Sequence, residues 1–332
     1  MFRVLQLCGV SLIDESCQVA GSFKSRGVAC QLRAFARLEY WRPIITFTSG
    51  NHGLAVALYA RRGGQAPTII VPDWVEHDKR LLLERLGCNV IMAGLTASEC
   101  ERHALDVCAD VGGFMAHPYR SRDQIVGYSS LWSEIARTFP DGADIVVPVG
   151  SGGLLAAGVL YRRQTNARYH IIGVEPSRCP SLAQTLSGGV AFPVAGRSLA
   201  APALNVDTTP DEILAIIESM EGVDLCQVTE VEIEIATNYL HAHGHAVDPA
   251  AGTAFAAAVF RSIPRHNKHL VVILTGASAK RNLARMEAEG RLSASISEIT
   301  RTIGKPGEMR RYDLSVPPEP CVSSAISEAQ LA

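Results

Sequence analysis

The chain has 332 residues, of which 47% are hydrophobic and 19% are charged, and its formal net charge is −2. This near-neutral charge excludes the strongly basic surface typical of nucleic-acid or anionic-membrane partners, and no apolar run reaches the roughly 18 residues that a membrane span needs. The nine cysteines have no paired spacing, and residues 1–10 lack a basic segment followed by a long apolar one. We therefore expect a cytoplasmic protein with reduced thiols.

Short apolar runs alternate with longer helical patterns along most of the chain. The runs that predict strands are residues 4–7, 10–15, 43–47, 67–72, 89–92, 145–148, 169–174 and 269–274. Residues 76–86 and 97–111 predict two of the intervening helices. Alternation of this kind gives an α/β fold, with a largely parallel sheet, right-handed crossovers and both faces buried.

Three glycine-rich segments carry the chemical signal. The first, Gly-Ser-Phe-Lys-Ser-Arg-Gly at residues 21–27, places Lys24 ahead of a helical stretch. A lysine acts as an amine nucleophile when its ammonium group is desolvated or crowded by other cations; the alternative is an ordinary solvated lysine. The other two segments, residues 48–53 and 149–154, each follow a strand and precede a helix rich in Ala and Leu. Such turns point free N–H groups at an anion.

Together, these three segments resemble the fold-type II family of pyridoxal 5′-phosphate enzymes, which includes threonine and serine dehydratases, serine racemase, threonine synthase and cysteine synthase. The resemblance covers about residues 12–282. It implies a pyridoxal 5′-phosphate cofactor, a small amino-acid substrate, a homodimer and a two-domain fold like that of the tryptophan synthase β subunit. Residues 1–42 and 121–290 would form the large cofactor-binding domain, residues 43–120 the small α/β domain and residues 291–332 an extended C-terminal tail.

The resemblance assigns Lys24 to the Schiff base with the cofactor aldehyde, and then to the movement of the Cα proton of the substrate. Phe23 would lie beside the cofactor. The phosphate would be held by the loop of Gly150, Ser151, Gly152, Gly153 and Leu154. A dinucleotide site is the alternative for this loop, because Glu175 ends the next strand, but Leu155 stands where that motif needs Gly or Ala.

The segment Thr-Ser-Gly-Asn-His-Gly at residues 48–53 resembles the loop of the dehydratase and racemase branch. By this resemblance, Asn51 contacts the 3′ oxygen of the cofactor, and Ser49, Gly50, Asn51 and His52 bind the substrate carboxylate. Ser49 is also a candidate for returning a proton to the opposite face of Cα, as racemases require. For His52 the alternative is a brace for the loop, and for the Asn-His pair it is a plain helix cap.

Thr275 ends a strand where the resemblance places a hydroxyl against the pyridine nitrogen. A neutral hydroxyl does not keep this nitrogen protonated, so a long-lived carbanion is disfavoured, and β-elimination or β-replacement is favoured over transamination. A strand-terminating Thr-Gly turn is the alternative reading.

Some family features differ in this chain. Asp248 stands where Glu is usual, and Ser181 replaces the second carboxylate that would hold a divalent ion together with Glu175. We therefore expect no metal. The histidines His241, His243 and His245 predict a turn around Gly244 rather than a metal site. A segment ahead of the lysine motif is missing, and the C-terminal tail is too short for a regulatory domain, so we expect no allosteric amino-acid site.

The sequence thus predicts a pyridoxal-phosphate-dependent lyase that catalyses β-elimination of a small hydroxy amino acid such as L-threonine or L-serine. Phe23 and His52 favour this dehydratase branch. Three alternatives stay open. They are a β- or γ-replacement synthase, similar to threonine synthase (as Thr275 suggests) or to cysteine synthase, an amino-acid racemase, and a degenerate member without activity.

Overall fold

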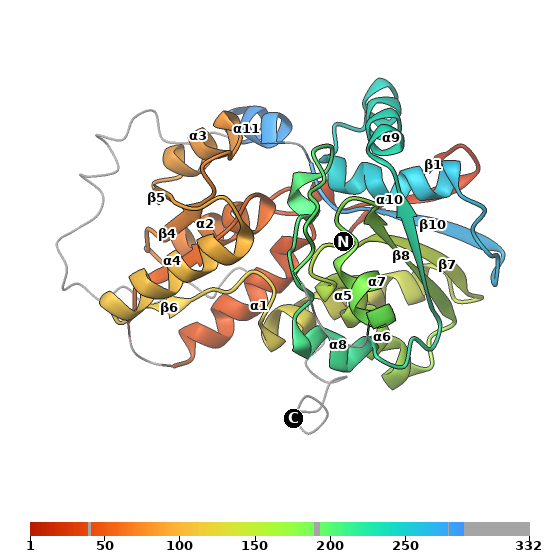
Figure 1. Ribbon diagram of the computed structural model, residues 1–332, viewed down its shortest axis with the longest axis horizontal. Helices are drawn as coiled ribbons and strands as arrows, with labels where there is room; N and C mark the ends of the chain where they lie inside the picture. Colours follow the sequence, from red (N-terminus) through yellow and green to blue (C-terminus); the bar gives the residue numbers. More distant parts are fainter. Residues whose placement is uncertain (39–40, 189–192, 278, 289–332) are drawn as a thin grey trace.

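The protein contains two β-sheets. The computed structural model describes residues 1–38, 41–188, 193–277 and 279–288. One sheet has six strands in the order β1-β2-β10-β7-β8-β9, and the other has four in the order β5-β4-β3-β6. Figure 1 shows them side by side, each with its own helices. The predicted α/β class with parallel and mixed sheets is confirmed. The predicted tail, residues 291–332, lies outside the described residues.

The larger sheet is parallel apart from its first strand. Its strands are β1 (Arg3–Leu7), β2 (Val10–Asp14), β7 (Ala143–Pro148), β8 (Tyr169–Pro176), β9 (Val223–Val228) and β10 (His269–Leu274). β1 pairs antiparallel with β2 through a turn at Cys8 and Gly9, whose φ angles of 51° and 75° suit a type I′ turn. β10, the last strand among the described residues, lies between β2 and β7 at the centre of the sheet.

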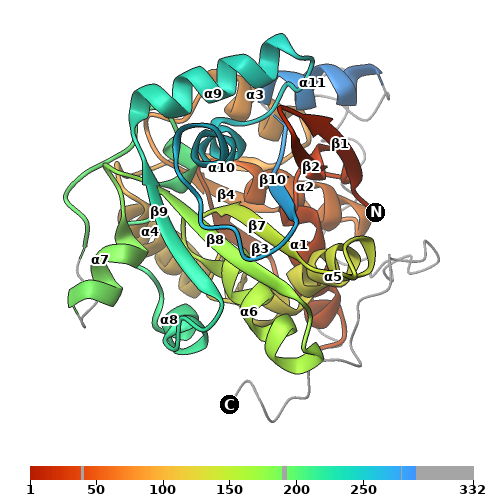
Figure 2. The ribbon, with the colours of Figure 1, turned by 90° about the vertical axis from the view of Figure 1, so that its right-hand side faces the viewer.

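Helices cover both faces of this sheet, which Figure 2 shows nearly end-on. Ile145 and Ile171 face a core shared with α5 (Arg122–Thr138), α6 (Gly153–Thr165) and α8 (Asp211–Ile217). Val146 and Ile172, one residue further along each strand, face α9 (Glu230–Ala242) and α10 (Pro249–Phe260). Because both faces are buried, the central strands are continuously apolar, which is why the sequence revealed them.

The smaller sheet is parallel throughout and consists of β3 (Ile44–Phe47), β4 (Thr68–Val71), β5 (Asn89–Met92) and β6 (Phe114–Met115). α2 (Asn51–Arg62) and α3 (His77–Arg85) pack on one face, and α4 (Ala97–Asp110) packs on the other. α1 (Lys24–Ala36) and α11 (Ala279–Ala288) also bury side chains in the first of these cores. Each sheet lies within one part of the predicted domain division, whose boundaries stay a prediction.

The short elements lie in the connections of the larger half. They are η1 (Glu15–Cys17), α7 (Ser181–Gly188) and η2 (Pro202–Leu204). The most important helix contact is the crossing of α1 and α5, where a Cβ on Gly127 would lie 2.4 Å from the Arg26 carbonyl oxygen. Arg26 is buried here and pairs with Glu15 at 2.8 Å and with Glu134 at 2.9 Å. These contacts fix the first turn of α1, which carries Lys24.

The lysine loop is also joined to the end of β10. Phe23 N donates to Thr275 O at 3.0 Å, Ala277 N donates to Gly21 O at 2.8 Å, and Ser22 forms an antiparallel bridge with Gly276. Two segments about 250 residues apart in the sequence therefore share one small hydrogen-bonded patch beside the cavity described next.

Candidate active site

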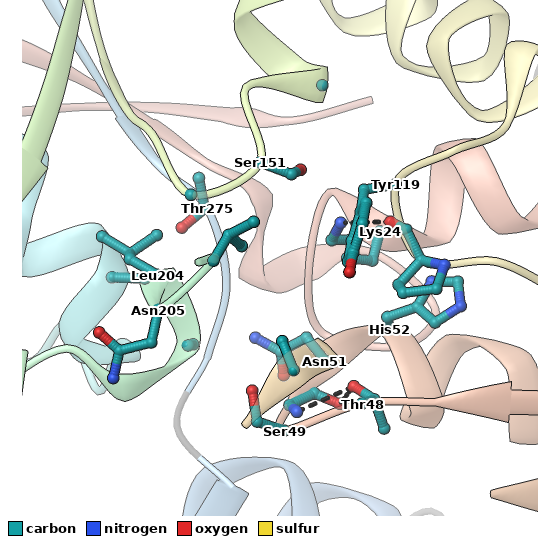
Figure 3. A pocket seen from close by; sticks show the side chains of 18 of the residues that line it. Lys24, Thr48, Ser49, Asn51, His52, Tyr119, Ser151, Leu204, Asn205 and Thr275 are labelled. Atoms are coloured by element: carbon teal, nitrogen blue, oxygen red, sulfur yellow. Dashed lines mark hydrogen bonds between the residues drawn. The ribbon is translucent and has the colours of Figure 1, made fainter. Parts of the chain in front are cut away.

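A cavity of about 150 Å³ lies where the carboxyl ends of strands from both sheets meet. Ligands of α/β proteins bind at this edge of a sheet. All the predicted site residues line this cavity: Phe23, Lys24, Ser49, Gly50, Asn51, His52, Gly150, Ser151, Gly152, Gly153, Leu154 and Thr275. Figure 3 shows that Lys24, Asn51, Ser151 and Thr275 surround one space. The structure thus brings the residues together, while their individual roles stay predictions.

Lys24 begins α1, and its amine lies in an apolar setting. Nζ is 5.1 Å from the ring centroid of Phe23 and 5.6 Å from that of Tyr128, and it donates to the Pro118 carbonyl oxygen at 3.2 Å. Burial lowers the pKa of Lys24 from 10.5 to about 8, because the charged form loses its hydration. The neutral, nucleophilic amine is therefore well populated near physiological pH.

The loop between β3 and α2 forms the opposite wall. Thr48 closes this loop, since Gly50 N donates to Thr48 Oγ1 at 2.9 Å. The Gly50 amide is therefore engaged within the loop itself. A Cβ on Gly276 would lie 3.0 Å from Asn51 Nδ2, so the Asn51 amide packs against the segment that follows Thr275. Ser49 lies beside it at the rim of the same space (Figure 3).

His52 faces the protein more than the cavity. Its Nε2 lies 3.0 Å from the Ala116 carbonyl oxygen and 3.1 Å from Thr46 Oγ1. Burial, together with the charge of Lys24, lowers the pKa of His52 to about 3, so the imidazole is neutral at physiological pH. This geometry favours the bracing role over direct contact with substrate.

The glycine loop after β7 leads directly into α6. Gly152 has a φ of 85°, a left-handed conformation that favours glycine, and it is the N-cap of α6 without any side-chain cap. A Cβ on Gly150 would lie 3.3 Å from Leu204 Cα, so η2 packs closely on the loop. The first turn of this 13-residue helix thus offers uncapped amide groups to the cavity.

These residues fit pyridoxal 5′-phosphate. The buried amine suits an aldehyde, the uncapped N-terminus of α6 suits a phosphate, and the Thr275 hydroxyl is a neutral partner for a ring nitrogen. The fold and the cavity therefore define an α/β enzyme that holds a phosphorylated aldehyde cofactor between two sheets.

Comparison with known proteins gives the family. Residues 4–276 match the family described as pyridoxal-phosphate-dependent enzyme. The chain belongs to this family, and the predicted fold-type II class and cofactor are confirmed. It is 28% identical over 269 residues to an L-threonine ammonia-lyase of Thermotoga maritima, covering 81% of this chain and 67% of that protein. It is 26% identical over 274 residues to a serine racemase of Bos taurus, covering 79% and 80% of the two chains.

Among solved structures, the processed form of threonine deaminase isoform 2 from Solanum lycopersicum is similar to this protein. The TM-score is 0.71 at 25% identity, and the match covers 90% of this chain and 84% of that one. The chain spans 67%, 29% and 65% of the length of the first three curated relatives that it matches.

Several cavity residues lie outside the predicted set. They are, among others, Trp74, Tyr119, Arg197 and Asn205. Tyr119 Oη donates to Glu101 at 3.1 Å, and Glu101 also lies 3.1 Å from His117 Nε2. No glycine motif surrounds these residues, and they come from connections with little periodicity. The sequence offered only one signal for such residues, namely a bulky or charged side chain within one of these connections.

The residues considered for metal binding have other partners in the structure. The Glu175 carboxylate accepts hydrogen bonds from Leu182 N at 2.8 Å and from Ala183 N at 2.9 Å, so it caps α7. Burial raises the pKa of Glu175 to about 7. His241 Nε2 bonds the Val247 carbonyl oxygen at 2.9 Å, and Gly244 makes the predicted turn with a φ of 83°.

The described part of the chain has no helix with the length and apolar character needed to cross a bilayer. The eight cysteines in the described residues are free thiols: Cys8, Cys17, Cys30, Cys88, Cys100, Cys108, Cys179 and Cys226.

Proposed function

We propose that this protein is a pyridoxal-phosphate-dependent lyase that removes water from a small hydroxy amino acid, such as L-threonine or L-serine, and releases ammonia and a 2-oxo acid. The observation that carries the proposal is the buried Lys24 amine in the same cavity as a hydroxyl, Thr275, where the ring nitrogen would lie. The similarity to L-threonine ammonia-lyase supports the substrate class.

Pyridoxal phosphate, when bound, supplies an electron sink that acidifies the Cα proton of an amino acid attached to it. Lys24 takes this proton. Its pKa of about 8 lies near the operating pH, so the amine is both free to accept the proton and acidic enough to give it up again. The apolar contacts with Phe23 and Tyr128 exclude water from the amine.

The two loops hold the anionic groups at opposite ends of the cavity. The uncapped first turn of α6, after Gly152, binds the phosphate through its amide groups and helix dipole. Ser49 and Asn51, at the start of α2, bind the substrate carboxylate and the cofactor oxygen. His52 holds this loop through Thr46 and Ala116.

Racemisation is the second candidate. Ser49 lines the cavity, as a group that returns a proton to the opposite face of Cα requires, and the chain is similar to a serine racemase. A replacement synthase and a degenerate binding protein are the remaining alternatives. Retention of Lys24 and of the whole set of predicted residues in one cavity opposes the degenerate reading.

The proposal is tested by absorbance and product assays on the purified protein. We expect a visible band that is absent in Lys24→Ala and present in Lys268→Ala, an exposed lysine of the loop before β10. Adding L-serine and then L-threonine is expected to change the band and to release 2-oxo acid.

Other outcomes identify the alternatives. A stable band without oxo acid would favour a replacement synthase, and appearance of the D-enantiomer, lost in Ser49→Ala, would favour a racemase. Absence of any visible band after addition of pyridoxal phosphate would contradict the whole proposal.

We also propose that the protein is a homodimer in the cytoplasm. The family resemblance supports the dimer, and the free thiols agree with a reducing compartment. Sedimentation equilibrium of the purified protein tests the dimer, and a monomer at micromolar concentration would contradict it.

A further inference from the structure

Two histidines and an aspartate gather at the edge of the larger sheet opposite the cavity. They are His170, the second residue of β8, Asp224, the second residue of β9, and His266, in the loop between α10 and β10. One ligand atom from each lies within 4.8 Å of the others. The cavity lies at the carboxyl ends of the strands, so this His-Asp-His cluster is separate from it.

Strand register places two of the three side chains together. Asp144 of β7 pairs with His170, and Ile172, two residues after His170, pairs with Asp224. Residues paired across strands, or two apart along one strand, point to the same face. Asp144, His170 and Asp224 therefore share the face that α9 and α10 cover further along the strands.

The third side chain is positioned by Asp144, whose carboxylate is buried. His266 N and Asn267 N donate to Asp144 Oδ2 at 3.0 and 3.1 Å, and Asn267 Nδ2 donates to Oδ1 at 2.8 Å. These three hydrogen bonds fix the loop between α10 and β10 beside the sheet. The ring of His266 lies against that of His170, with centroids 3.9 Å apart and the ring planes tilted by 31°.

The distances within the cluster suit a metal ion. His170 Nε2 lies 2.8 Å and His266 Nε2 lies 3.5 Å from the same oxygen, Asp224 Oδ2. Bonds of about 2.0–2.1 Å in a tetrahedral zinc site separate neighbouring ligand atoms by about 3.3 Å, which falls between these two values. We propose that the His-Asp-His cluster binds one divalent transition-metal ion, with Zn²⁺ the best match to two imidazoles and a carboxylate.

The surroundings are compatible with a bound cation. Arg265 is the cation next to His266, and it pairs with Asp144 at 3.5 Å. The His266 and Asp224 side chains are about half exposed, at 47% and 42%, so water can complete the coordination. The ion would join β8, β9 and the loop that leads to β10. Because the site lies at the opposite edge from the cavity, its effect is on stability and not on catalysis.

The experiment measures zinc on the holoenzyme after chelator treatment and equilibrium dialysis against Zn²⁺. Wild type is compared with His170→Ala, His266→Ala and Asp224→Asn, and with His103→Ala, an exposed histidine of α4, as the matched control. Differences between variants are decisive, because the exposed thiols Cys8 and Cys17 also attract zinc. The visible band of the cofactor verifies that each variant is folded.

We expect wild type and His103→Ala to hold one more equivalent of zinc than the three cluster variants. We also expect zinc to raise the melting temperature of wild type and of His103→Ala but not of the three cluster variants, with unchanged lyase activity. Asp224→Asn preserves the shape of the side chain, so it separates loss of a ligand from loss of packing. Equal zinc content in all five proteins would overturn the proposal. The cluster would then be a hydrogen-bonded His-Asp pair with a second histidine beside it.

Discussion

Burial, and not a charged neighbour, sets the pKa of the Lys24 amine. Burial lowers its pKa to about 8, and two aromatic rings and a carbonyl oxygen are its contacts. Below this pKa the neutral fraction of the amine falls about tenfold for each pH unit, and only the neutral amine is a nucleophile.

Covalent capture of pyridoxal phosphate by the apoenzyme is therefore expected to quicken about tenfold from pH 6 to pH 7 and to level off above pH 8. Stopped-flow absorbance from pH 6 to pH 9 measures this rate, with a free lysine derivative as the reference for changes in the cofactor itself. A rate that still rises about tenfold between pH 8 and pH 9 would show an unperturbed lysine.

In the proposed function Thr275 acts through its hydroxyl, because its carbonyl oxygen is already bonded to Phe23 N. Replacing Thr275 by Val keeps the shape and the backbone contact while removing the hydroxyl. We expect kcat to fall by about one to two orders of magnitude and Thr275→Ser to retain most activity. Steady-state oxo-acid release measures both, and equal activity of the Val and Ser variants would exclude a role for the hydroxyl.

At the residue level, the sequence indicated those cavity residues that have glycines beside them. Lys24, Asn51 and Ser151 each lie in a glycine-rich turn, and all reach the cavity. Tyr119 and Arg197 reach it too, but they come from irregular connections whose path depends on tertiary packing. Apart from the bulky or charged side chain itself, nothing in their local sequence indicated that they line the cavity.

Among the helices, the crossing of α1 and α5 controls the position of the lysine. A methyl group on Gly127 would lie 2.4 Å from Arg26 O and 2.7 Å from Gly27 Cα, both backbone atoms that move only with their helix. Gly127→Ala is therefore expected to destabilise the protein by about 1–3 kcal/mol and to weaken the visible band.

Thermal and urea unfolding measure the effect of Gly127→Ala. Gly188→Ala is the control, because a Cβ there meets no atom of the described residues within 4 Å. Equal stability of the two variants would show that the helices separate without cost.

The buried ion pairs of Arg26 hold the same helix. Arg26→Met would leave Glu15, which is fully buried, without its cation. Breaking one partner of a buried pair costs about 3–5 kcal/mol, so we expect a large fall in the free energy of unfolding. Arg80→Met, which breaks a partly exposed pair with Glu84, is expected to cost less than about 1 kcal/mol. Urea denaturation compares the two.

The elements themselves were predictable where both faces are buried. Residues 145–148 and 270–274 are uniformly apolar and lie in β7 and β10. The sequence did not predict β9, because this strand lies at the edge of the sheet and carries Asp224, Cys226 and Gln227 on partly exposed faces. β6 has only two residues, too few for any periodicity.

For the whole molecule, the cavity joins two sheets that otherwise have separate cores. Cofactor bound there contacts elements of both, so it stabilises both against unfolding. At a free concentration of 100 times its Kd, it is expected to add about 2.7 kcal/mol. Calorimetry of apoenzyme and holoenzyme is expected to show a single unfolding transition whose midpoint temperature rises when the cofactor is bound. If two transitions appeared and only one of them shifted, the cofactor would stabilise one sheet alone.

The position of β10 has a consequence for biosynthesis. Strands β2 and β7 have no direct pairing until β10 enters between them, and β10 is the last strand of the described chain to leave the ribosome. Lys24 emerges early, but the loop that holds it waits for residues 275–277. A nascent chain therefore cannot complete the loop that holds Lys24 until residues 275–277 have been made, and a chain released before residue 269 displays two unpaired strand edges of the kind that leads to aggregation.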